Sequence, residues 1–382
     1  MSVCRPHGLR KLLSKKGNFI LNTYHLNNTN IHIISGAKNW LESAALSQLE
    51  GVAQLPGVVR AVGLPDLHAG KSPVGMALET ENIIYPHLIG GDIGCGMGLF
   101  DTGLGIGRYN EKRWLSRLNH IRALVDLAPE NPYSEPSPIS DLGTIGGGNH
   151  FVEFQRLETV FSSDDLAELN LPKNNIVVLV HSGSRGYGQA IFKSLNYTIG
   201  LKDDSPEAVA YLQKHDDALL WARRNRAIVA AELIGWLGYE GEPRPLIDLF
   251  HNHLVQKEGV WIHRKGAVSS KEGLVVLPGS RGSLTYIIKP TAETARSAWS
   301  LSHGAGRKWA RSLCKSRIKN MYDRDSIRQT RLKSKVVCHD TDLLFQEAPE
   351  AYKNIEHIVA ALLEHGLITL VASLKPLITY KG

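Results

Sequence analysis

Two side chains able to bind a metal ion, Asp92 and Cys95, lie three residues apart in the stretch 90–98, which contains five glycines. Glycine lets other groups approach the backbone closely, at a cost in chain entropy, so the stretch indicates that something comes very near to it. A tight turn with a buried free cysteine explains the same spacing, because unpaired cysteine often behaves as a small hydrophobic residue. The stretch by itself leaves a structural turn and a metal site as alternatives.

Five of the 16 histidines share an unusual context, since each stands in a segment rich in glycine, serine or asparagine and not on an apolar helix face. Taken singly, such a histidine is more often structural than a ligand. Five together are hard to explain by packing, because glycine loops bury little surface and cost entropy. We therefore expect these side chains to surround one cavity with Asp92 and Cys95. They are His68, His150, His181, His251 and His303.

This set of carboxylate, thiolate and imidazole groups narrows the choice of metal. Ca²⁺ and Mg²⁺ alone favour oxygen ligands. A thiolate with several imidazoles suits a borderline transition metal such as Zn²⁺, Co²⁺ or Mn²⁺, and a thiolate can bridge two ions. The ligand types do not decide which of these ions is used.

Three glycine loops, 146–148, 278–283 and 304–307, are candidates for phosphate contact. They expose backbone N–H groups, and serine hydroxyls or arginine guanidinium groups stand beside them. The Walker pattern is incomplete, because Pro65 stands where it needs a glycine before Gly70-Lys71-Ser72. The sequence therefore excludes a P-loop nucleotide triphosphatase, and the Lys-x-Asp-Gly pattern of lysine-nucleotidylating ligases is absent as well.

Composition is that of a globular protein, with 43% hydrophobic and 21% charged residues in 382. The four cysteines are scattered without a CxxC pair, which argues against a disulfide scaffold and a thiolate zinc finger. We therefore expect a reducing compartment and a cytoplasmic location. No span is apolar enough for a membrane helix, because Glu364, His365 and Lys375 interrupt the best candidate, 358–380.

Basic residues are concentrated in two places. The first 41 residues carry six Lys or Arg and no Asp or Glu, which resembles a transit peptide in composition, although we favour a basic N-terminal strand region. Residues 307–335 hold eleven Lys or Arg against two Asp, a local charge of +9 in a chain whose net charge is +7. Such a segment favours a polyanionic partner such as nucleic acid, with a solvated helix face as the alternative.

Hydrophobic periodicity predicts a mixture of helices and strands spread over the whole chain. Short strands are expected within 18–36, glycine-rich strands within 58–107, a strand at 176–180 that leads to His181, and further strands near 275–276 and 284–288. Helices are expected at 37–54, 110–128, 206–236, 291–321 and 350–366, with a loop at 128–140. Without a repeat or a linker, this order predicts one intertwined α+β domain over residues 1–382, of which 1–40 form a variable basic segment.

Several motifs along the chain together resemble the RtcB family of RNA ligases. They run in family order from about residue 40 to the C-terminus, and include Asp92–Met97, Gly146–Phe151, His181–Gly186, Arg264–Ala267, Ser302–Arg307, Pro65–His68, Glu347–Lys353 and Lys381–Gly382. The resemblance implies an RtcB-like fold with central β-sheets, flanking helices and a cleft for metal and nucleotide.

The reaction implied by this resemblance is the GTP- and Mn²⁺-dependent joining of an RNA 2′,3′-cyclic phosphate or 3′-phosphate end to a 5′-hydroxyl end. His303 matches the histidine that is guanylylated. By motif matching, two Mn²⁺ ions would be held by Asp92, Cys95, His150, His181 and His251, with Cys95 bridging them. Residues 90–98 would then give both ions room against the backbone.

The resemblance also implies which residues surround the nucleotide, with Glu153 and Lys381 as readers of guanine. Arg185 and Asn225 would lie toward the phosphate or the RNA. The remaining nucleotide contacts are Asn149, Ser280, Thr285, Gly304, Ala305, Gly306, Arg307 and Tyr352. Expected partners are RNA with the ends named above and, as an option that the sequence leaves open, an activating protein.

Departures from the family pattern leave the RNA target open between tRNA splicing and repair of ribonuclease-cut RNA. Arg281 stands where the family has Met in the block 278–282, and the residues around His68 also vary. Two other functions compete with ligation. A metal-dependent phosphodiesterase that opens cyclic phosphates would need neither His303 nor a guanine reader, and a non-catalytic RNA-binding protein would need no metal ligands.

Overall fold

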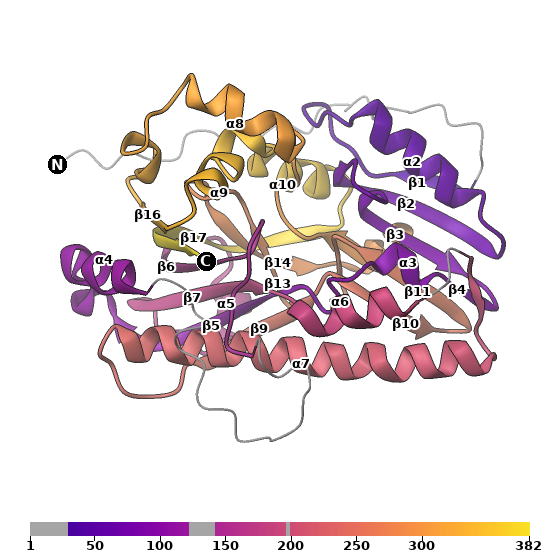
Figure 1. Cartoon of the computed structure of the whole chain (residues 1–382), viewed down its shortest axis with the longest axis horizontal. Helices are drawn as coiled ribbons and strands as arrows, with labels where there is room; N and C mark the ends of the chain where they lie inside the picture. Colours follow the sequence, from indigo (N-terminus) through magenta and orange to yellow (C-terminus); the bar gives the residue numbers. More distant parts are fainter. Residues whose placement is uncertain (1–29, 122–141, 196–198) are drawn as a thin grey trace.

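The computed structural model describes residues 30–121, 142–195 and 199–382 (Figure 1). Its larger sheet has the strand order β13-β14-β17-β6-β7-β5-β9, and β16 pairs with β17. These strands are β5 (Gly96–Gly105), β6 (Phe151–Val160), β7 (Asn175–Ser182), β9 (Arg244–Phe250), β13 (Val275–Pro278), β14 (Thr285–Pro290), β16 (Lys335–Cys338) and β17 (Ile368–Lys381).

Strand β7 explains why this sheet is buried on both faces. Side chains alternate between the two faces of a strand. Val177 and Leu179 therefore enter one hydrophobic cluster, with β13, β14 and helix α10 (Ile355–Glu364), while Val178 and Val180 enter a second cluster on the other face. The aliphatic run that predicted a strand here thus supplies both cores.

Helix α7 (Pro206–Trp236) covers the second face and runs along the lower edge of the molecule in Figure 1. Its start is favourable, because Pro206 occupies the first turn and the Ser205 side chain accepts a hydrogen bond from the Ala208 N–H. Val229, Leu233 and neighbouring residues pack beneath the sheet. Burying one such side chain contributes about 1.5–3 kcal/mol.

A smaller sheet has the order β1-β2-β3-β11-β10, and two further strand pairs, β4-β8 and β12-β15, lie beside it. Helix α2 (Ser43–Ala53) packs on this sheet, with Ala45 and Leu49 in one cluster with Leu67 and Met76. The strands are β1 (Ile31–Ile33), β2 (Val58–His68), β3 (Val74–Thr80), β4 (Ile83–Ile84), β8 (Leu201–Lys202), β10 (Asn252–Lys257), β11 (Val260–Lys265), β12 (Ala267–Ser269) and β15 (Ser300–Ser302).

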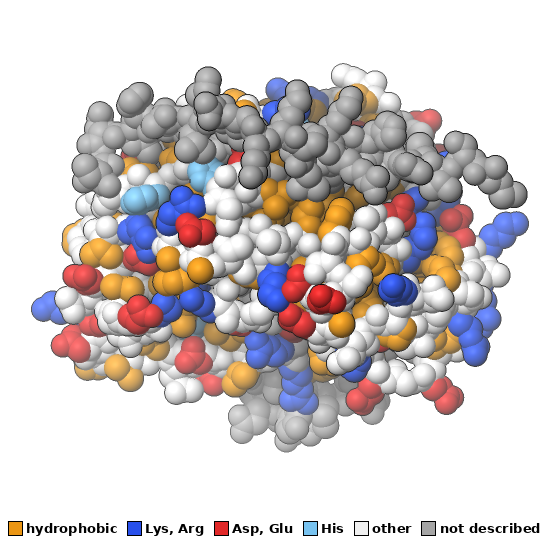
Figure 2. All heavy atoms as spheres, turned by 180° about the vertical axis from the view of Figure 1, so that it is seen from behind, with side chains coloured by type: hydrophobic (Ala, Val, Ile, Leu, Met, Phe, Trp, Pro, Cys, Tyr) orange, Lys and Arg blue, Asp and Glu red, His pale blue; other side chains and the backbone are white. Residues whose placement is uncertain are grey.

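The remaining helices connect the strands and cover their edges. The α-helices are α3 (Pro86–Ile89), α4 (Glu111–His120), α5 (Ser163–Ala167), α6 (Arg185–Ser194), α8 (Arg311–Lys319) and α9 (Thr341–Gln346), and the 3₁₀ helices are η1 (Ile106–Arg108), η4 (Ala292–Ser297), η5 (Ser326–Arg328) and η6 (Pro349–Ala351). Among the described residues no helix combines the length and apolar character needed to cross a bilayer. On the face opposite to Figure 1, basic and acidic side chains are interspersed (Figure 2).

The α+β fold class predicted from the sequence is confirmed, and so is the long helix 206–236. The predicted helix 291–321 is wrong over much of its length. It contains η4, then strand β15, and only from Arg311 helix α8, because Ala298 and Trp299 adopt positive φ and turn the chain back to pair with β12. Of the short strands expected within 18–36, β1 is present. Residues 18–29, residues 122–128 of the predicted helix 110–128 and the predicted loop 128–140 lie outside the described residues.

Candidate active site

Strand order brings the candidate metal ligands to one edge of the larger sheet. Neighbouring strands β6, β7, β5 and β9 are all antiparallel, so the starts of β6 and β5 lie beside the ends of β7 and β9. His150 precedes β6, Cys95 precedes β5, His181 lies near the end of β7, and His251 follows β9. Residues more than 150 positions apart in the sequence, such as Cys95 and His251, therefore meet at this edge.

The side chains at this edge form a buried cluster. Cys95 Sγ lies 3.3 Å from His150 Nε2 and 3.2 Å from His181 Nε2, and the ligand atoms of these three residues all lie within 4.8 Å of one another. Asp92 Oδ2 is 3.0 Å from His150 Nε2, and His251 Nε2 is 3.4 Å from His181 Nε2. Nitrogen, sulfur and oxygen donors thus converge on one small volume, which fits a borderline transition-metal ion.

Burial sets the protonation state of the candidate ligands in this cluster. Burial lowers the pKa of His181 and of His251 well below the usual value, so both imidazoles are neutral and carry a free lone pair. Burial and the Asp92 carboxylate raise the pKa of the Cys95 thiol, so a bound cation would have to stabilise its thiolate form. His181 Nδ1 lies 3.1 Å from the Asn149 carbonyl oxygen, and donating a hydrogen bond there leaves Nε2 facing Cys95.

The close approach expected at the stretch 90–98 is found at three of its glycines. At Gly94, Gly96 and Gly98 the approaching group is protein. A Cβ on Gly96 would lie 2.4 Å from the Leu249 carbonyl oxygen of β9, one on Gly94 would meet Ala222 of α7 at 3.0 Å, and one on Gly98 would meet the Phe100 ring. The absence of side chains at these positions lets β5 pack between β9 and α7, and this packing holds Cys95 in place.

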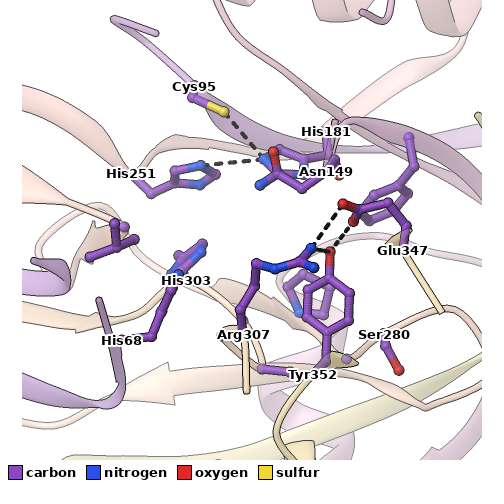
Figure 3. Close-up of a pocket in the computed structure, with 18 of the residues that line it drawn as sticks. His68, Cys95, Asn149, His181, His251, Ser280, His303, Arg307, Glu347 and Tyr352 are labelled. Carbon is purple, nitrogen blue, oxygen red and sulfur yellow. Dashed lines mark hydrogen bonds and ion pairs between the residues drawn. The ribbon is translucent and has the colours of Figure 1, made fainter. Parts of the chain in front are cut away.

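His303 follows directly after β15 and lies beside His251 in the cavity (Figure 3). Its ring centroid is 4.9 Å from that of His251, so it adjoins the cluster of candidate metal ligands. His303 Nδ1 lies 2.6 Å from Oδ2 of Asp66, which also accepts a hydrogen bond from the His303 backbone N–H at 3.1 Å. The nitrogen left for other chemistry is therefore Nε2.

Asp66 is fully buried, yet it is held as a carboxylate. Burial acts to raise its pKa, but the neighbouring His303 and His68 imidazoles and the hydrogen bonds from His303 and Ser302 leave the pKa of Asp66 below its usual value. A buried carboxylate on Nδ1 fixes the tautomer and the orientation of an imidazole and stabilises positive charge that develops on the ring.

One cavity of about 540 Å³, a volume in the range of small-molecule sites, is lined by His68, Asp92, Cys95, His181, His251 and His303. His150, which was expected to line it, and Asp66 are not part of this lining. One wall carries Cys95, His181, His251 and His303, as described above. The facing wall carries Ser280, Arg307, Glu347, Tyr352 and Lys381, and Figure 3 shows Arg307, Tyr352 and Glu347 directed toward one another. The predicted nucleotide residues Asn149, Glu153, Gly304, Ala305 and Gly306 line it as well.

Glu347 is the centre of the polar network on that wall. Its side chain is 1% exposed and accepts hydrogen bonds from Arg307 Nη1 at 2.8 Å, from Arg311 Nε at 3.2 Å and from the Tyr352 hydroxyl. Arg307 also donates hydrogen bonds to the carbonyl oxygens of Trp309 and Gln346, to Cys314 Sγ and to the Tyr352 hydroxyl oxygen. All five donors of Arg307 are thus engaged within the protein, so it orders this wall and keeps Tyr352 in position.

Glu153 and Lys381 lie at the inner end of the cavity. Burial raises the pKa of Glu153 to about 7 and lowers the pKa of Lys381 to about 8. Glu153 accepts hydrogen bonds from Thr379 Oγ1 at 2.5 Å and from Gln155 Nε2 at 2.6 Å, and Gln155 also donates to Thr285 Oγ1 at 2.8 Å. Thr285 is buried and does not line the cavity, so it contacts this end only through Gln155.

Arg185 and Asn225 do not line the cavity. The Asn225 side chain accepts hydrogen bonds from the N–H groups of Gly143 and Thr144 and donates to Thr144 O and Ser182 Oγ. It therefore ties the loop before β6 to the end of β7. Arg185 contacts Thr144 Oγ1 at 3.4 Å and belongs to the same region.

Two residues central to this geometry, Asp66 and Glu347, belong to the motifs 65–68 and 347–353, but the resemblance assigned neither of them a role. A signal for each was present. Asp66 interrupts the apolar strand 58–68, and Glu347 stands between Phe345 and Ala348, both buried. A carboxylate in such surroundings needs a positively charged or hydrogen-bonding partner.

Taken together, the fold and the cavity define an enzyme-like site in which a buried cluster of metal ligands adjoins a histidine held by a carboxylate and a polar cavity. The sequence profile of the family described as tRNA-splicing ligase RtcB matches residues 48–130 and 125–382. The chain belongs to this RtcB family.

Similarity to individual proteins extends over most of the chain. The chain is 40% identical over 360 residues to the protein named RNA-splicing ligase RtcB2 of an Escherichia coli strain. The match covers 90% of this chain and 93% of that protein. It is 27% identical to RNA-splicing ligase RtcB of Escherichia coli K12, covering 90% and 95%. It is 26% identical to tRNA-splicing ligase RtcB of Archaeoglobus fulgidus, covering 90% and 92%.

Proposed function

We propose that this chain is an RNA ligase that joins a 2′,3′-cyclic phosphate or 3′-phosphate end to a 5′-hydroxyl end, using GTP and Mn²⁺, through a guanylylated His303. The observation that carries the proposal is the position of His303. Its Nδ1 is held by Asp66 at 2.6 Å, and its ring adjoins His251 at a centroid distance of 4.9 Å. A nucleophile thus lies between a group that orients it and a set of metal ligands.

In the first step His303 Nε2 attacks the α-phosphorus of GTP, and the bond to pyrophosphate breaks. Asp66 keeps Nε2 directed into the cavity and stabilises the positive charge that the ring gains. Two Mn²⁺ ions held by Asp92, Cys95, His150, His181 and His251 would supply positive charge against the phosphate oxygens. The resulting histidine phosphoramidate is a good donor of the guanylyl group.

In the following steps the guanylyl group moves from His303 to an oxygen of the RNA 3′-phosphate, and the N–P bond breaks. The 5′-hydroxyl then attacks the activated 3′-phosphorus, and GMP leaves. A cyclic phosphate must first be opened by water to a 3′-phosphate. The names of the relatives, which include RNA-splicing and tRNA-splicing ligases, support RNA as the substrate.

The nucleotide would occupy the cavity between His303 and the wall of Glu347, Tyr352 and Lys381. The Glu153 carboxylate would accept hydrogen bonds from guanine and the Lys381 ammonium would donate to its carbonyl oxygen. Both are buried, so these bonds would form away from water, where they discriminate best between bases. Arg307 and Thr285 would act indirectly, since their hydrogen bonds connect to Tyr352 and Gln155.

A cytoplasmic location fits this function, because the three described cysteines are free, as expected in a reducing compartment. An activating protein would be an optional partner that accelerates guanylylation.

A ligation assay with two oligonucleotides tests this function. One carries a 2′,3′-cyclic phosphate and the other a 5′-hydroxyl, with GTP and Mn²⁺ present. We expect a joined product whose formation requires GTP. A 3′-phosphate end that accumulates without joining would instead support the phosphodiesterase.

A further inference from the structure

A second cavity, of about 910 Å³, adjoins the first. The two share part of their walls, namely Ser280, Arg281, Lys308, Trp309 and Tyr352. Beyond this shared wall the second cavity is bounded by residues 38–40, by the segment 321–331 after α8, and by 349–357 before and at the start of α10. We call it the outer groove. Figure 1 shows α8 and α2 on the same upper side of the molecule, the side on which these segments lie.

Flat aromatic side chains line the outer groove. Trp40 is 59% exposed, an unusual degree for an indole, and Trp309 and Tyr322 are partly exposed. The Lys308 ammonium and the Arg317 guanidinium lie 5.2 Å and 5.1 Å from the centroid of the Trp309 ring. Exposed aromatic faces beside cations are the surfaces on which nucleic-acid bases stack.

The charges of the outer groove are mostly positive. Lys38, Lys308 and Arg331 are exposed, and none of them forms an ion pair within the described part of the chain. Glu350 is the acidic residue of the lining, and its Oε1 accepts a hydrogen bond from the Tyr322 hydroxyl at 2.7 Å. The groove therefore has exposed cations available for phosphate groups.

Arg281 adds a buried cation at the wall between the two cavities. It is 7% exposed, and its Nη2 donates to the Leu344 carbonyl oxygen at 2.8 Å. Its Nε and Nη1 have no hydrogen-bond partner among the described residues. Unpartnered N–H groups on a buried guanidinium are costly unless an acceptor binds them, so an anionic group is expected at this wall.

We propose that the outer groove binds single-stranded RNA next to the ends that are joined. This inference rests on the proposed ligase function and names the place of its substrate. Bases stack on Trp40 and Trp309, and the phosphates of the same strand contact Lys38, Lys308 and Arg331. Stacking and ionic contacts both tolerate any base sequence, so the groove selects single-stranded RNA and not a particular sequence.

Binding of 3′-phosphorylated oligonucleotides of two and ten nucleotides tests the proposal, by fluorescence anisotropy on the full chain. Trp40→Ala should weaken binding of the ten-mer about 10-fold, a usual loss for one stacked base. Its affinity for the two-mer, and its covalent labelling by GTP, should stay as in wild type, because Trp40 does not line the first cavity. Trp236→Ala is the matched control, since Trp236 is 42% exposed and lies outside both cavities.

The contribution of charge to RNA binding is tested by comparing Arg331→Ala with Arg108→Ala. Arg108 is the control because it is exposed and lies outside both cavities. Arg331→Ala should weaken binding of the ten-mer. It should also reduce the magnitude of the slope of log affinity against log salt concentration by about one. Unchanged ten-mer affinity in both Trp40→Ala and Arg331→Ala would overturn the proposal.

Photocrosslinking with 5-iodouridine identifies the contact directly. Adducts on Trp40 or Trp309, with either the 3′-phosphate strand or the 5′-hydroxyl strand, support the outer groove. Adducts confined to other surfaces would refute it. Because binding is measured without GTP, a wild-type chain that binds the ten-mer but takes up no GMP would contradict the ligase chemistry and not the groove.

Discussion

His303 Nδ1 lies 2.6 Å from Oδ2 of Asp66, a residue 237 positions earlier in the chain, and the same oxygen accepts the His303 backbone N–H. The two contacts fix both the ring and the backbone of the proposed nucleophile. They also join the smaller sheet to the strand pair β12-β15, since Asp66 belongs to β2 and His303 follows β15.

Asp66→Asn should therefore slow guanylylation much more than it lowers stability. The amide cannot stabilise the charged imidazole and permits the wrong tautomer, so we expect a loss on the order of 10²–10⁴-fold in the rate of covalent labelling. The rate is measured with saturating GTP, and thermal unfolding provides the control for folding. A variant that folds and labels at the wild-type rate would show that this contact is structural only.

Cys95→Ser should abolish Mn²⁺-dependent guanylylation while leaving the fold largely intact. Serine preserves the size of the side chain but replaces the thiolate that would bridge two ions with a poor ligand. Bound manganese is measured after equilibrium dialysis, and covalent labelling by α-labelled GTP is measured on the same samples. Cys338→Ser, a buried cysteine with no contact to the histidine cluster, is the matched control. Full activity of Cys95→Ser would refute the bridging role.

Glu153 should make stability depend on pH. Its pKa is about 7 in the folded chain against 4.5 for an ordinary glutamate. Between these values the folded chain keeps a proton that the unfolded chain has lost, so the free energy of unfolding falls as pH rises from about 4.5 to about 7, by roughly 3 kcal/mol. Urea unfolding at pH 4.5 and 7.5 measures this fall, which Glu153→Gln should remove.

Glu158→Gln, at the exposed end of the same strand, is the control for that comparison. An equal pH dependence in wild type and Glu153→Gln would show that another group is responsible.

Arg307→Lys should disturb the nucleotide wall although the charge is kept. A single ammonium cannot reach Glu347, Tyr352 and the Gln346 carbonyl oxygen at once, as the planar guanidinium does. We expect the KM for GTP to rise about 10-fold and stability to fall by about 1–3 kcal/mol, because an ammonium leaves some of the buried hydrogen-bonding groups around Glu347 without a partner. Steady-state kinetics and urea unfolding measure the two effects. Arg324→Lys, which is exposed, should change neither, and an unchanged KM in Arg307→Lys would contradict the role of this network.

Much of the fold could be predicted from local sequence. The Ser205 cap, Pro206 and the apolar spacing define α7, and five consecutive aliphatic residues define β7. The region 291–321 could not be predicted in this way. Its apolar spacing is compatible with a helix, and the pairing of β15 with β12 depends on partners more than 30 residues away.

The candidate site was predictable in its residue types and not in its geometry. Histidines in glycine loops, together with Asp92 and Cys95, indicated one cavity, and Cys95, His181, His251 and His303 do line one. The pairing of Asp66 with His303, and the convergence of Arg307, Arg311 and Tyr352 on Glu347, follow from sheet order and from contacts between distant segments. Periodicity contains no information on such contacts, so a buried carboxylate is the only local sign of them.

The most direct test of the whole account is covalent labelling of the full chain by α-labelled GTP in the presence of Mn²⁺. We predict one labelled protein adduct in wild type, stable to denaturation and cleaved by acid as expected for a phosphoramidate, and none in His303→Ala. Absence of an adduct from wild-type protein that contains manganese, or an undiminished adduct in His303→Ala, would contradict the guanylylation of His303.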